Sequence, residues 1–309
     1  MPKIYLLHCF PVPYRNHLFE ALDKEAKKRQ LSFEVEFFSS YDSSRPTWSY
    51  TSDQLKFRHK FWKYIFKKGP VLHLNIDLLW YIFKEKPDII ILGGLWASFN
   101  TVLVSLFSNS TVIVWDEVNR FDFGSVKKNF QWIKRRLVDS NKFFAIPGLE
   151  AKLYYKELLS MEAFEQKTFL SLPNLVNERL FDFNEEEVQK NQLTLKKEFQ
   201  LPEDKKIAFW PARLIKDKGI ENFIQYLNDD ILNEWVIIIL GDGPLKKPIQ
   251  ELIALKKLQA KIIQIDTMPY ESAIKFYSIA NLLIMPSLSD SNPLSLIEGI
   301  HSGLPVLVS

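Results

Sequence analysis

The sequence has few of the residues that define several common protein classes. Cys9 is the single cysteine in 309 residues, which excludes a disulfide framework and is typical of a reducing cytoplasm. The first residues lack the charged, apolar and small segments of a signal peptide, so we expect none. The loop after the first predicted strand, Cys9–Arg15, has no glycine, which weakens a dinucleotide-binding interpretation. These absences favour a cytoplasmic protein that is not a dehydrogenase.

A run without charged residues, Ile89–Trp115, is long enough to suggest a membrane span. Gly93-Gly94, Asn100 and the polar residues 108–111 interrupt it, however. Turn formers at these places predict a strand, a helix and a second strand of a buried parallel sheet. We therefore reject the membrane span.

Length and composition indicate a globular chain with two domains. Hydrophobic residues make up 47% and charged residues 25%, and 309 residues exceed the usual size of one core. Residues 1–180 hold 26 Lys and Arg against 19 Asp and Glu, whereas residues 181–309 hold 14 against 18. A basic first half and an acidic second half argue for two domains with different partners.

Short apolar runs alternate with helical patterns along the whole chain, which predicts an α/β fold with doubly wound parallel sheets. The expected strands are Lys3–His8, Phe33–Phe38, Asp88–Leu92, Thr111–Trp115, Lys142–Ile146, Thr168–Leu172, Lys206–Trp210, Val236–Leu240, Lys261–Ile265, Leu282–Met285 and Leu304–Ser309. The first helix is expected at Asn16–Arg29. An acidic run near residues 180–205 is read as a linker, which places the domains at 1–183 and 184–309.

The stretch Asn281–Ser309 reads as strand, loop, helix and strand. Asn292 and Pro293 supply a helix cap and a first helical residue, and Leu294, Ile297 and Ile300 are expected to form the buried face. Loops that leave the carboxyl ends of strands are where open α/β sheets bind ligands. The backbone N–H groups of Leu294 and Ser295 are expected to face an anion there.

Two carboxylates, Asp290 and Glu298, flank this predicted anion site. Such a pair suits a ligand with a phosphate in the middle and hydroxyls at both ends, which describes a nucleotide-sugar. The alternative interpretation is an ordinary βαβ unit with two solvated acids.

The spacing Asp290 to Glu298, followed by a Gly-Leu-Pro-Val strand, resembles the donor site of retaining GT-B glycosyltransferases of family 4. The segment Pro211–Gly219 is similar to the family's Gly-Arg-Leu-x(3)-Lys-Gly, and Gly241–Pro244 to its glycine-rich turn. Three departures stand out: Asp290 replaces a Glu, Asn292-Pro293 replaces Phe-Gly, and Ala212 replaces a Gly. The resemblance is strong from residue 207 onward and loose before it.

The resemblance implies two Rossmann-like domains facing a cleft, with the donor in the second. It implies that Glu298 holds the ribose hydroxyls, that Asp290 touches the donor sugar, and that the Leu294 and Ser295 amides bind phosphate. Gly241 and Gly243 belong to the same donor site.

Arg213 and Lys218 are implied to clamp the diphosphate, because charge accumulates on the leaving nucleotide diphosphate in the transition state. No Asp-x-Asp occurs in the chain, so the metal ligands of the other main transferase architecture are missing. We therefore expect no cofactor and no metal: the two cations and the helix amides stand in for one.

The acceptor is expected in the first domain, where candidate residues follow predicted strands. Arg15 either meets a phosphate or pairs with a neighbouring acid. Asp116 and Glu117 either orient an acceptor hydroxyl or cap a helix. His8 is a further candidate that packing alone would also explain.

Two basic and aromatic stretches, Phe57–Gly69 and Lys127–Leu137, suit an anionic membrane surface. The alternative is a core of aromatics with a solvated lysine rim. No groove-reading motif accompanies these stretches, so nucleic acid is not an expected partner.

Our first hypothesis is an enzyme that transfers a hexosyl or hexosaminyl group with retention, from a UDP- or GDP-sugar to a glycan or lipid-linked glycan in cell-surface polysaccharide synthesis. It would act in the cytoplasm or at the inner face of the membrane. The second hypothesis is an incompetent nucleotide-sugar-binding subunit completed by a partner chain. The chain stops on the strand Leu304–Ser309, where family members continue, so we expect an incomplete second domain. The base, the sugar, the acceptor and the oligomeric state are not encoded in any spacing.

Overall fold

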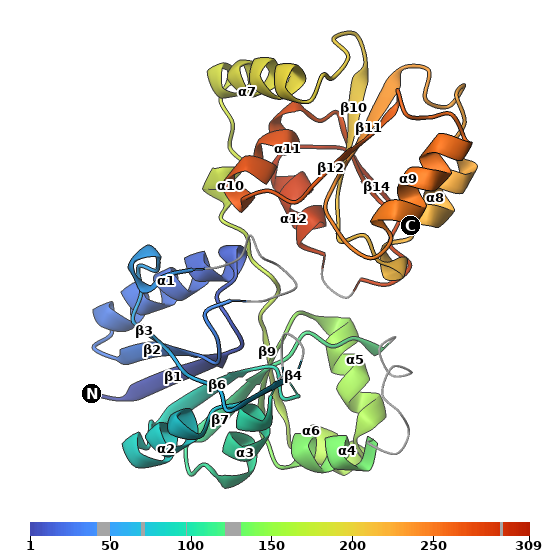
Figure 1. The fold of residues 1–309 in the computed structure, drawn as a ribbon. Coiled ribbons are helices and arrows are strands. Elements are labelled where there is room, and N and C mark those ends of the chain that lie inside the picture. The colour runs from blue at the N-terminus through green and yellow to red at the C-terminus, as the bar shows by residue number, and fades with distance from the viewer. Residues whose placement is uncertain (42–49, 69–71, 97, 121–130, 291–292) are drawn as a thin grey trace. The chain divides into compact units, whose positions relative to one another are not determined.

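The structure is a computed structural model that describes all residues except 42–49, 69–71, 97, 121–130 and 291–292 (Figure 1). It consists of two compact units, Met1–Leu175 and Val176–Ser309. Each unit has its own parallel sheet with helices on both faces, as the alternating sequence pattern predicts.

The sheet of the first unit has seven strands in the order β3-β2-β1-β6-β7-β8-β9. The strands are β1 (Lys3–His8), β2 (Ser32–Phe37), β3 (His59–Phe61), β6 (Ile89–Gly93), β7 (Thr111–Trp115), β8 (Phe143–Ile146) and β9 (Thr168–Ser171), all parallel to their neighbours. A separate antiparallel hairpin pairs β4 (Phe66–Lys68) with β5 (Leu72–Leu74). The helices are α1 (Pro13–Lys28), α2 (Ile76–Glu85), α3 (Phe99–Phe107), α4 (Gln131–Asp139), α5 (Leu149–Leu158) and α6 (Met161–Glu165).

The sheet of the second unit has five strands in the order β12-β11-β10-β13-β14. They are β10 (Lys206–Pro211), β11 (Trp235–Leu240), β12 (Ile262–Ile265), β13 (Leu282–Met285) and β14 (Val306–Val308). The helices are α7 (Glu185–Glu198), α8 (Ile220–Tyr226), α9 (Lys246–Leu255), α10 (Tyr270–Ala273), α11 (Lys275–Ile279) and α12 (Leu294–His301).

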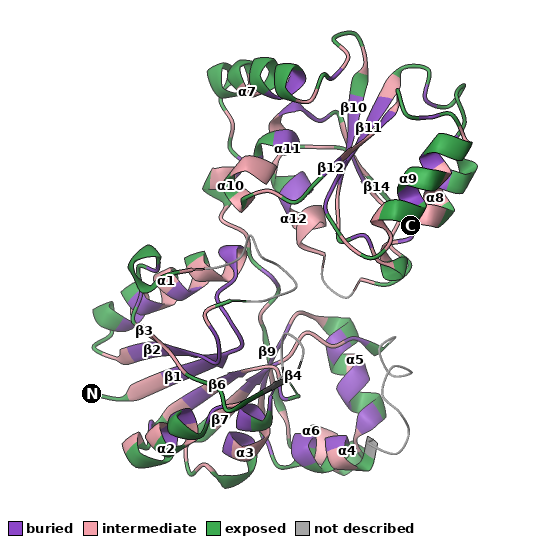
Figure 2. Cartoon of the chain, viewed as in Figure 1, coloured by how far each residue is buried: buried purple, intermediate pink, exposed green. Residues whose placement is uncertain are grey.

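Helices cover both faces of each sheet. Because successive side chains of a strand point to opposite faces, neighbouring residues of one strand join different apolar clusters. In β1, Leu7 joins one apolar cluster and Leu6 joins the other. In β10, Phe209 and Trp210 divide in the same way. Apolar runs without alternation are the sequence signature of such strands, which is why most strands of the two sheets were predicted. The short strands β3, β4 and β5 lack such a run and were not predicted. Figure 2 shows how burial is distributed along both sheets.

The α/β fold with parallel sheets is confirmed, as is the interpretation of residues 89–115 as β6, α3 and β7. Over the described part of the chain, no helix has the length and apolar character needed to cross a membrane.

The first helix begins earlier than predicted. α1 starts at Pro13, preceded by Val12 in an extended conformation, rather than at Asn16. Proline suits the first helical position because its missing N–H would have no intrahelical acceptor there. Arg15 therefore lies in the first turn of α1 and not in a loop.

The predicted linker is largely a helix. Residues 185–198 form α7, which Asn184 caps by accepting a hydrogen bond from the Glu187 N–H, and Asn191 bonds to Ser278 of α11. The unit boundary at Leu175/Val176 also precedes the predicted boundary at 183/184. Phe181 explains the shift, because its ring packs against Tyr277 in the second core.

The predicted buried face of α12 is wrong. Leu294 and Ile297 are only half-buried and Ile300 is 59% exposed, whereas Glu298 and Gly299 are buried. Gly299 lies against the Leu283 side chain of β13, where a Cβ atom would collide with it. The predicted cap Asn292 lies outside the described residues, and the helix begins one residue after Pro293.

Candidate functional site

The site of the second unit lies at the carboxyl edge of its sheet, where the strand order reverses. β10 has β11 on one side and β13 on the other, so the chain leaves these strands in opposite directions. In open α/β sheets, ligands bind beside such a reversal. The predicted donor residues all follow one of these three strands.

Glycines let the loops of this edge pack backbone against backbone. A Cβ on Gly241 would collide with the Ala212 carbonyl oxygen, and one on Gly243 would crowd the Leu214 carbonyl oxygen. Gly219 has φ +66° and lies directly against the Pro286 carbonyl oxygen. The structure thus gives Gly241 and Gly243 a packing reason to be glycine, whatever ligand they meet.

The turn after β10 is bonded to the loop after β13. The Leu288 N–H donates to the Asp217 carbonyl oxygen at 2.8 Å. Beside this contact the Lys218 ammonium forms an ion pair with the Asp290 carboxylate, and both side chains are about one-fifth exposed, 22% and 18%. Sequence reasoning placed both residues in the donor site but did not predict their pairing.

Arg213, the other predicted clamp residue, is exposed, and its guanidinium forms no hydrogen bond or ion pair with the residues that the structure describes. Among the described residues of the turn after β10, Lys218 is therefore paired with an acid, whereas Arg213 and the neighbouring exposed Lys216 are not.

Glu298 is buried under two tyrosines. Its carboxylate oxygens accept hydrogen bonds from the Tyr270 hydroxyl at 2.7 Å and the Tyr277 hydroxyl at 2.5 Å. Burial raises the pKa of Glu298, and the two tyrosine hydrogen bonds partly offset that rise. Each carboxylate oxygen has a second lone pair, which leaves an acceptor for the predicted ribose contact. No spacing rule pointed to these tyrosines, since they lie 28 and 21 residues before Glu298.

The amides of Leu294 and Ser295 lie in the first turn of α12, where helix geometry leaves N–H groups without an intrahelical acceptor. Both residues are half-buried. The helix has no acidic residue in its first turn, so nothing there competes with an anion for the positive end of the dipole.

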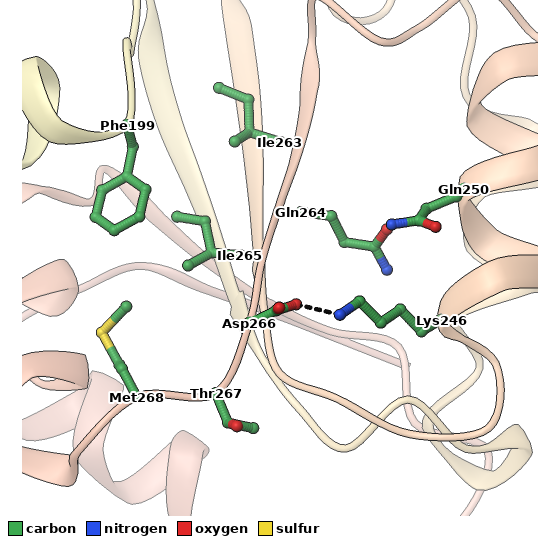
Figure 3. Close-up of a pocket in the computed structure, with 9 residues that line it drawn as sticks. All are labelled: Phe199, Lys246, Gln250, Ile263, Gln264, Ile265, Asp266, Thr267 and Met268. Atoms are coloured by element: carbon green, nitrogen blue, oxygen red, sulfur yellow. Dashed lines mark ion pairs between the residues drawn. The ribbon is translucent and has the colours of Figure 1, made fainter.

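A hollow of about 530 Å³ lies along the outer strand β12 (Figure 3). Thr267 and Met268 line it at the carboxyl end, and an ion pair between Lys246 and Asp266 borders it. The side-chain amide of Gln264 points into this region, and neither its oxygen nor its nitrogen has a hydrogen-bond partner in the described part of the chain.

The first unit has its own reversal point between β1 and β6, and a polar cluster occupies it. The His8 Nδ1–H donates to the Phe10 carbonyl oxygen at 2.8 Å, and His8 Nε2 accepts from Arg15 Nη1 at 2.6 Å. Arg15 Nη2 in turn donates to the Glu117 carboxylate. Burial and the Arg15 charge lower the pKa of His8 to about 3, which keeps the imidazole neutral.

Arg15 is further fixed by aromatic stacking, since its guanidinium carbon lies 4.5 Å from the centroid of the Trp115 ring. The Nε–H of Arg15 and the indole N–H of Trp115 are both buried without a hydrogen-bond partner in the described chain. Gly93 of β6 is required beside this cluster because a Cβ there would lie 2.8 Å from His8 Cδ2. Of the two alternatives given for Arg15, contact with a phosphate or pairing with a neighbouring acid, the structure shows the pairing, with Glu117.

Asp116 is not part of this chain of contacts. Its carboxylate accepts a hydrogen bond from the Tyr155 hydroxyl at 2.7 Å, and burial raises its pKa. The predicted acceptor residues therefore divide into Arg15 with Glu117, which are in contact, and Asp116, which faces α5.

Within the described ranges, no three His, Cys, Asp or Glu side chains are grouped as metal ligands would be. The charges at both edges are instead paired with side chains of the opposite sign or left free, as in Arg213.

Part of the chain is similar in sequence to known glycosyltransferases. Residues 191–309 match the family model of the glycosyl transferases group 1. The O-antigen biosynthesis glycosyltransferase WclY of Escherichia coli is 31% identical over 122 residues, which are 40% of this chain and 33% of that protein. The alpha-monoglucosyldiacylglycerol synthase of Acholeplasma laidlawii is 26% identical over 147 residues, 45% of this chain and 35% of that protein. The chain thus spans about a third of the length of these curated relatives.

Solved structures match over the whole chain. Sucrose-phosphate synthase from Thermosynechococcus elongatus superposes with a TM-score of 0.73 at 14% identity, covering 100% of this chain and 81% of that one. The Anabaena protein HepE, in complex with UDP and glucose, has a TM-score of 0.72 at 13% identity, with coverage of 100% and 80%. These similarities show the fold, two Rossmann-like domains of the GT-B type.

Proposed function

We propose that this protein is a retaining glycosyltransferase of family 4 that moves a hexosyl or hexosaminyl group from a UDP- or GDP-sugar to a glycan or lipid-linked glycan. The observation that carries the proposal is the pairing of Lys218 with Asp290 at the strand-order reversal of the second unit. It brings a cation suited to a diphosphate and a carboxylate suited to sugar hydroxyls to one point, a few residues before α12 in the chain.

The proposed donor site places positive charge beside the diphosphate, where negative charge develops in the transition state. Arg213, Lys218 and the first amides of α12 bind the diphosphate, and they stabilise it more as it leaves, because its negative charge grows. No metal is needed in this scheme. Asp290, once Lys218 turns to the diphosphate, accepts hydrogen bonds from the donor sugar, and Glu298 reaches the ribose through its free lone pairs.

The proposed acceptor site is the polar cluster of the first unit. Glu117 offsets the charge of Arg15, and His8 is neutral, so the cluster carries no net charge. Such a cluster offers a hydrogen-bond donor and an acceptor side by side, which suits sugar hydroxyls better than a phosphate. Retention follows the family pattern, in which the departing phosphate itself helps to deprotonate the acceptor.

Three relationships support this proposal: the family model over residues 191–309, the name of the O-antigen relative, and the UDP and glucose bound to the structurally similar HepE. The name of the O-antigen relative also favours a role in polysaccharide synthesis. The matched proteins are named as transferases and synthases, which does not favour the alternative of an incompetent binding subunit.

The test is in two stages. Thermal-shift screening with UDP, GDP and ADP identifies the base, since a ligand at 100 times its dissociation constant stabilises by about 2.7 kcal/mol. Turnover of labelled sugars on the preferred nucleotide then tests transfer. Nucleotide binding without transfer or hydrolysis, over a panel of sugars, would support the binding subunit and contradict the enzyme.

A further inference from the structure

Helix α3 has its polar and apolar faces inverted. Its buried residues include Asn100, Thr101 and Ser105, whereas Phe99, Leu106 and Phe107 are 45%, 43% and 66% exposed (Figure 2). The exposed positions recur at the spacing of one helical stripe, and the helix contains no charged residue. A helix in a water-soluble protein normally has the opposite arrangement.

All three buried polar residues of α3 form hydrogen bonds, which stabilises this inverted arrangement. Asn100 exchanges two hydrogen bonds with Asn75, its Oδ1 accepting from the Asn75 N–H at 2.9 Å and its Nδ2–H donating to Asn75 Oδ1 at 2.8 Å. The Thr101 hydroxyl donates to the Leu95 carbonyl oxygen, and the Ser105 hydroxyl accepts from Asn141 Nδ2. Buried polar groups with partners cost little, and they hold the apolar stripe outward.

Neighbouring segments extend this stripe into a continuous surface. On α2, Ile76, Trp80 and Phe83 are exposed at a helical spacing, and α2 contacts α3. From the hairpin, the Phe66 ring lies 6.1 Å from the Phe99 ring, and Ile65 beside it is 67% exposed. We call these eight residues the apolar face: Ile65, Phe66, Ile76, Trp80, Phe83, Phe99, Leu106 and Phe107.

Exposed lysines accompany the apolar face. Lys63 precedes the hairpin, Lys84 lies with its ammonium 4.5 Å from the Trp80 ring centroid, and Lys86 follows α2. Among the acids of the same segments, Glu85 pairs with the Lys3 ammonium, whereas Asp88 accepts a hydrogen bond only from the Lys3 backbone N–H. Three exposed lysines therefore stand against two acids without a cationic partner, Asp77 and Asp88. The surroundings of the apolar face are therefore net positive.

We propose that the apolar face docks on an anionic lipid bilayer, lying in its interface without crossing it. Aromatic and aliphatic side chains with adjacent lysines are what such an interface favours, since rings enter the boundary region and ammonium groups stay with the phosphates. Scattered exposed apolar residues on a protein surface are ordinary, but a contiguous face of this kind marks an interaction site. The proposal is independent of the donor site, which lies in the other unit.

The experiment is co-sedimentation of the full chain with phosphatidylcholine vesicles, with or without phosphatidylglycerol. The variant Trp80→Gln/Phe107→Gln removes two exposed rings and should weaken binding to acidic vesicles by about tenfold or more. The matched control Leu149→Gln/Met161→Gln removes two side chains of the same unit that are 69% and 57% exposed outside the apolar face, and it should bind like the wild type.

A charge variant tests the choice of lipid. Lys63→Glu/Lys84→Glu should bind acidic vesicles less and lose the salt dependence of the wild type, because screening acts on the lysine attraction. Lys152→Glu/Lys156→Glu, on α5 of the same unit, is the control of equal charge. The conservative Trp80→Phe should keep binding while reducing fluorescence quenching by brominated lipid.

Equal binding of all variants, equal recovery on neutral and acidic vesicles, or no recovery on either would overturn the proposal. A concentration-dependent dimer that Trp80→Gln/Phe107→Gln dissociates, without vesicle binding by the wild type, would assign the apolar face to a second copy instead. Thermal unfolding of each variant checks the fold, and thermal shift with nucleotide checks the donor site separately.

Discussion

The two sheets each carry an arginine beside the reversal of their strand order, and the two arginines are in opposite states. The Arg15 side chain is 12% exposed and is held by His8, Glu117 and Trp115. Arg213 is exposed, and its guanidinium has no polar partner in the described chain. One edge compensates its charge internally, which suits a neutral ligand, and the other keeps a charge available, which suits an anion. Two edges of the same fold type thus favour different ligands, because one arginine is paired within the protein and the other is available to bind an anion.

This difference predicts that low pH destabilises the first unit through protonation of His8. The pKa of His8 is lowered to about 3, whereas a histidine of the unfolded chain titrates near 6.5. Between these values the unfolded chain binds a proton that the folded chain does not, so stability falls as pH falls from about 6.5 to 3. At about 1.4 kcal/mol per pKa unit, the loss is about 4–5 kcal/mol.

Chemical denaturation as a function of pH measures this loss, with His8→Gln as the test variant. The variant should lack the His8 part of the acid destabilisation while retaining that of the carboxylates. His17→Gln removes an exposed histidine of α1 and is the matched control. Parallel pH curves for wild type and His8→Gln would show that His8 is not held neutral.

The exposed arginine should matter for turnover and not for stability. Arg213→Ala should lower kcat by about 10²–10³, equivalent to about 3–4 kcal/mol of transition-state stabilisation. Its midpoint of thermal unfolding should be unchanged, because substitutions of exposed residues without partners cost within about 0.5 kcal/mol. Lys216→Ala, an exposed cation in the same turn, is the control. A raised KM with full kcat would contradict the clamp.

The buried arginine should show the reverse. Arg15→Ala leaves Glu117 and His8 without their partner, and we expect a loss of about 2 kcal/mol in the free energy of unfolding, below the full value for a buried pair because Glu117 is 30% exposed. Glu117→Ala should lower the free energy of unfolding less in the Arg15→Ala background than in the wild type, because the interaction between the two side chains is already lost. Strict additivity in urea unfolding of the four proteins would show that the pair is not coupled.

The strands that lead into the sites were predictable because apolar periodicity and turn residues are local signals, although Arg15 lies in α1 and not in the predicted loop. The side-chain pairings were not. Arg15 and Glu117 are 102 residues apart, and Lys218 and Asp290 are 72 apart, so neither pairing leaves a spacing to read. The face of α12 was mispredicted for a related reason: Gly299 lets the helix approach Leu283, and this contact, rather than the apolar spacing, decides which side is buried. The inversion of α3 likewise depends on partners as distant as Asn75 and Asn141.

The smallest effect concerns Lys218, whose state lies between those of the two arginines. Its ion pair with Asp290 is about one-fifth exposed, and such pairs are worth up to about 1 kcal/mol. A diphosphate that takes Lys218 must first compete with that carboxylate. Asp290→Asn should therefore bind the preferred nucleoside diphosphate about three- to fivefold more tightly, although turnover should fall because the donor sugar loses a partner.

Calorimetric titration of the nucleoside diphosphate into the wild type, the two single variants and the double variant tests whether the ion pair restrains Lys218. In a Lys218→Ala background, Asp290→Asn should change the affinity little, because no cation remains to be released. Asp217→Asn removes an equal charge from the same turn without freeing Lys218, and it controls for the general increase in positive potential. A gain in affinity that is equal for Asp217→Asn, or that survives Lys218→Ala, would mean that the ion pair does not restrain Lys218. Arg213 would then be the residue of the second edge whose free charge contrasts with the paired guanidinium of Arg15.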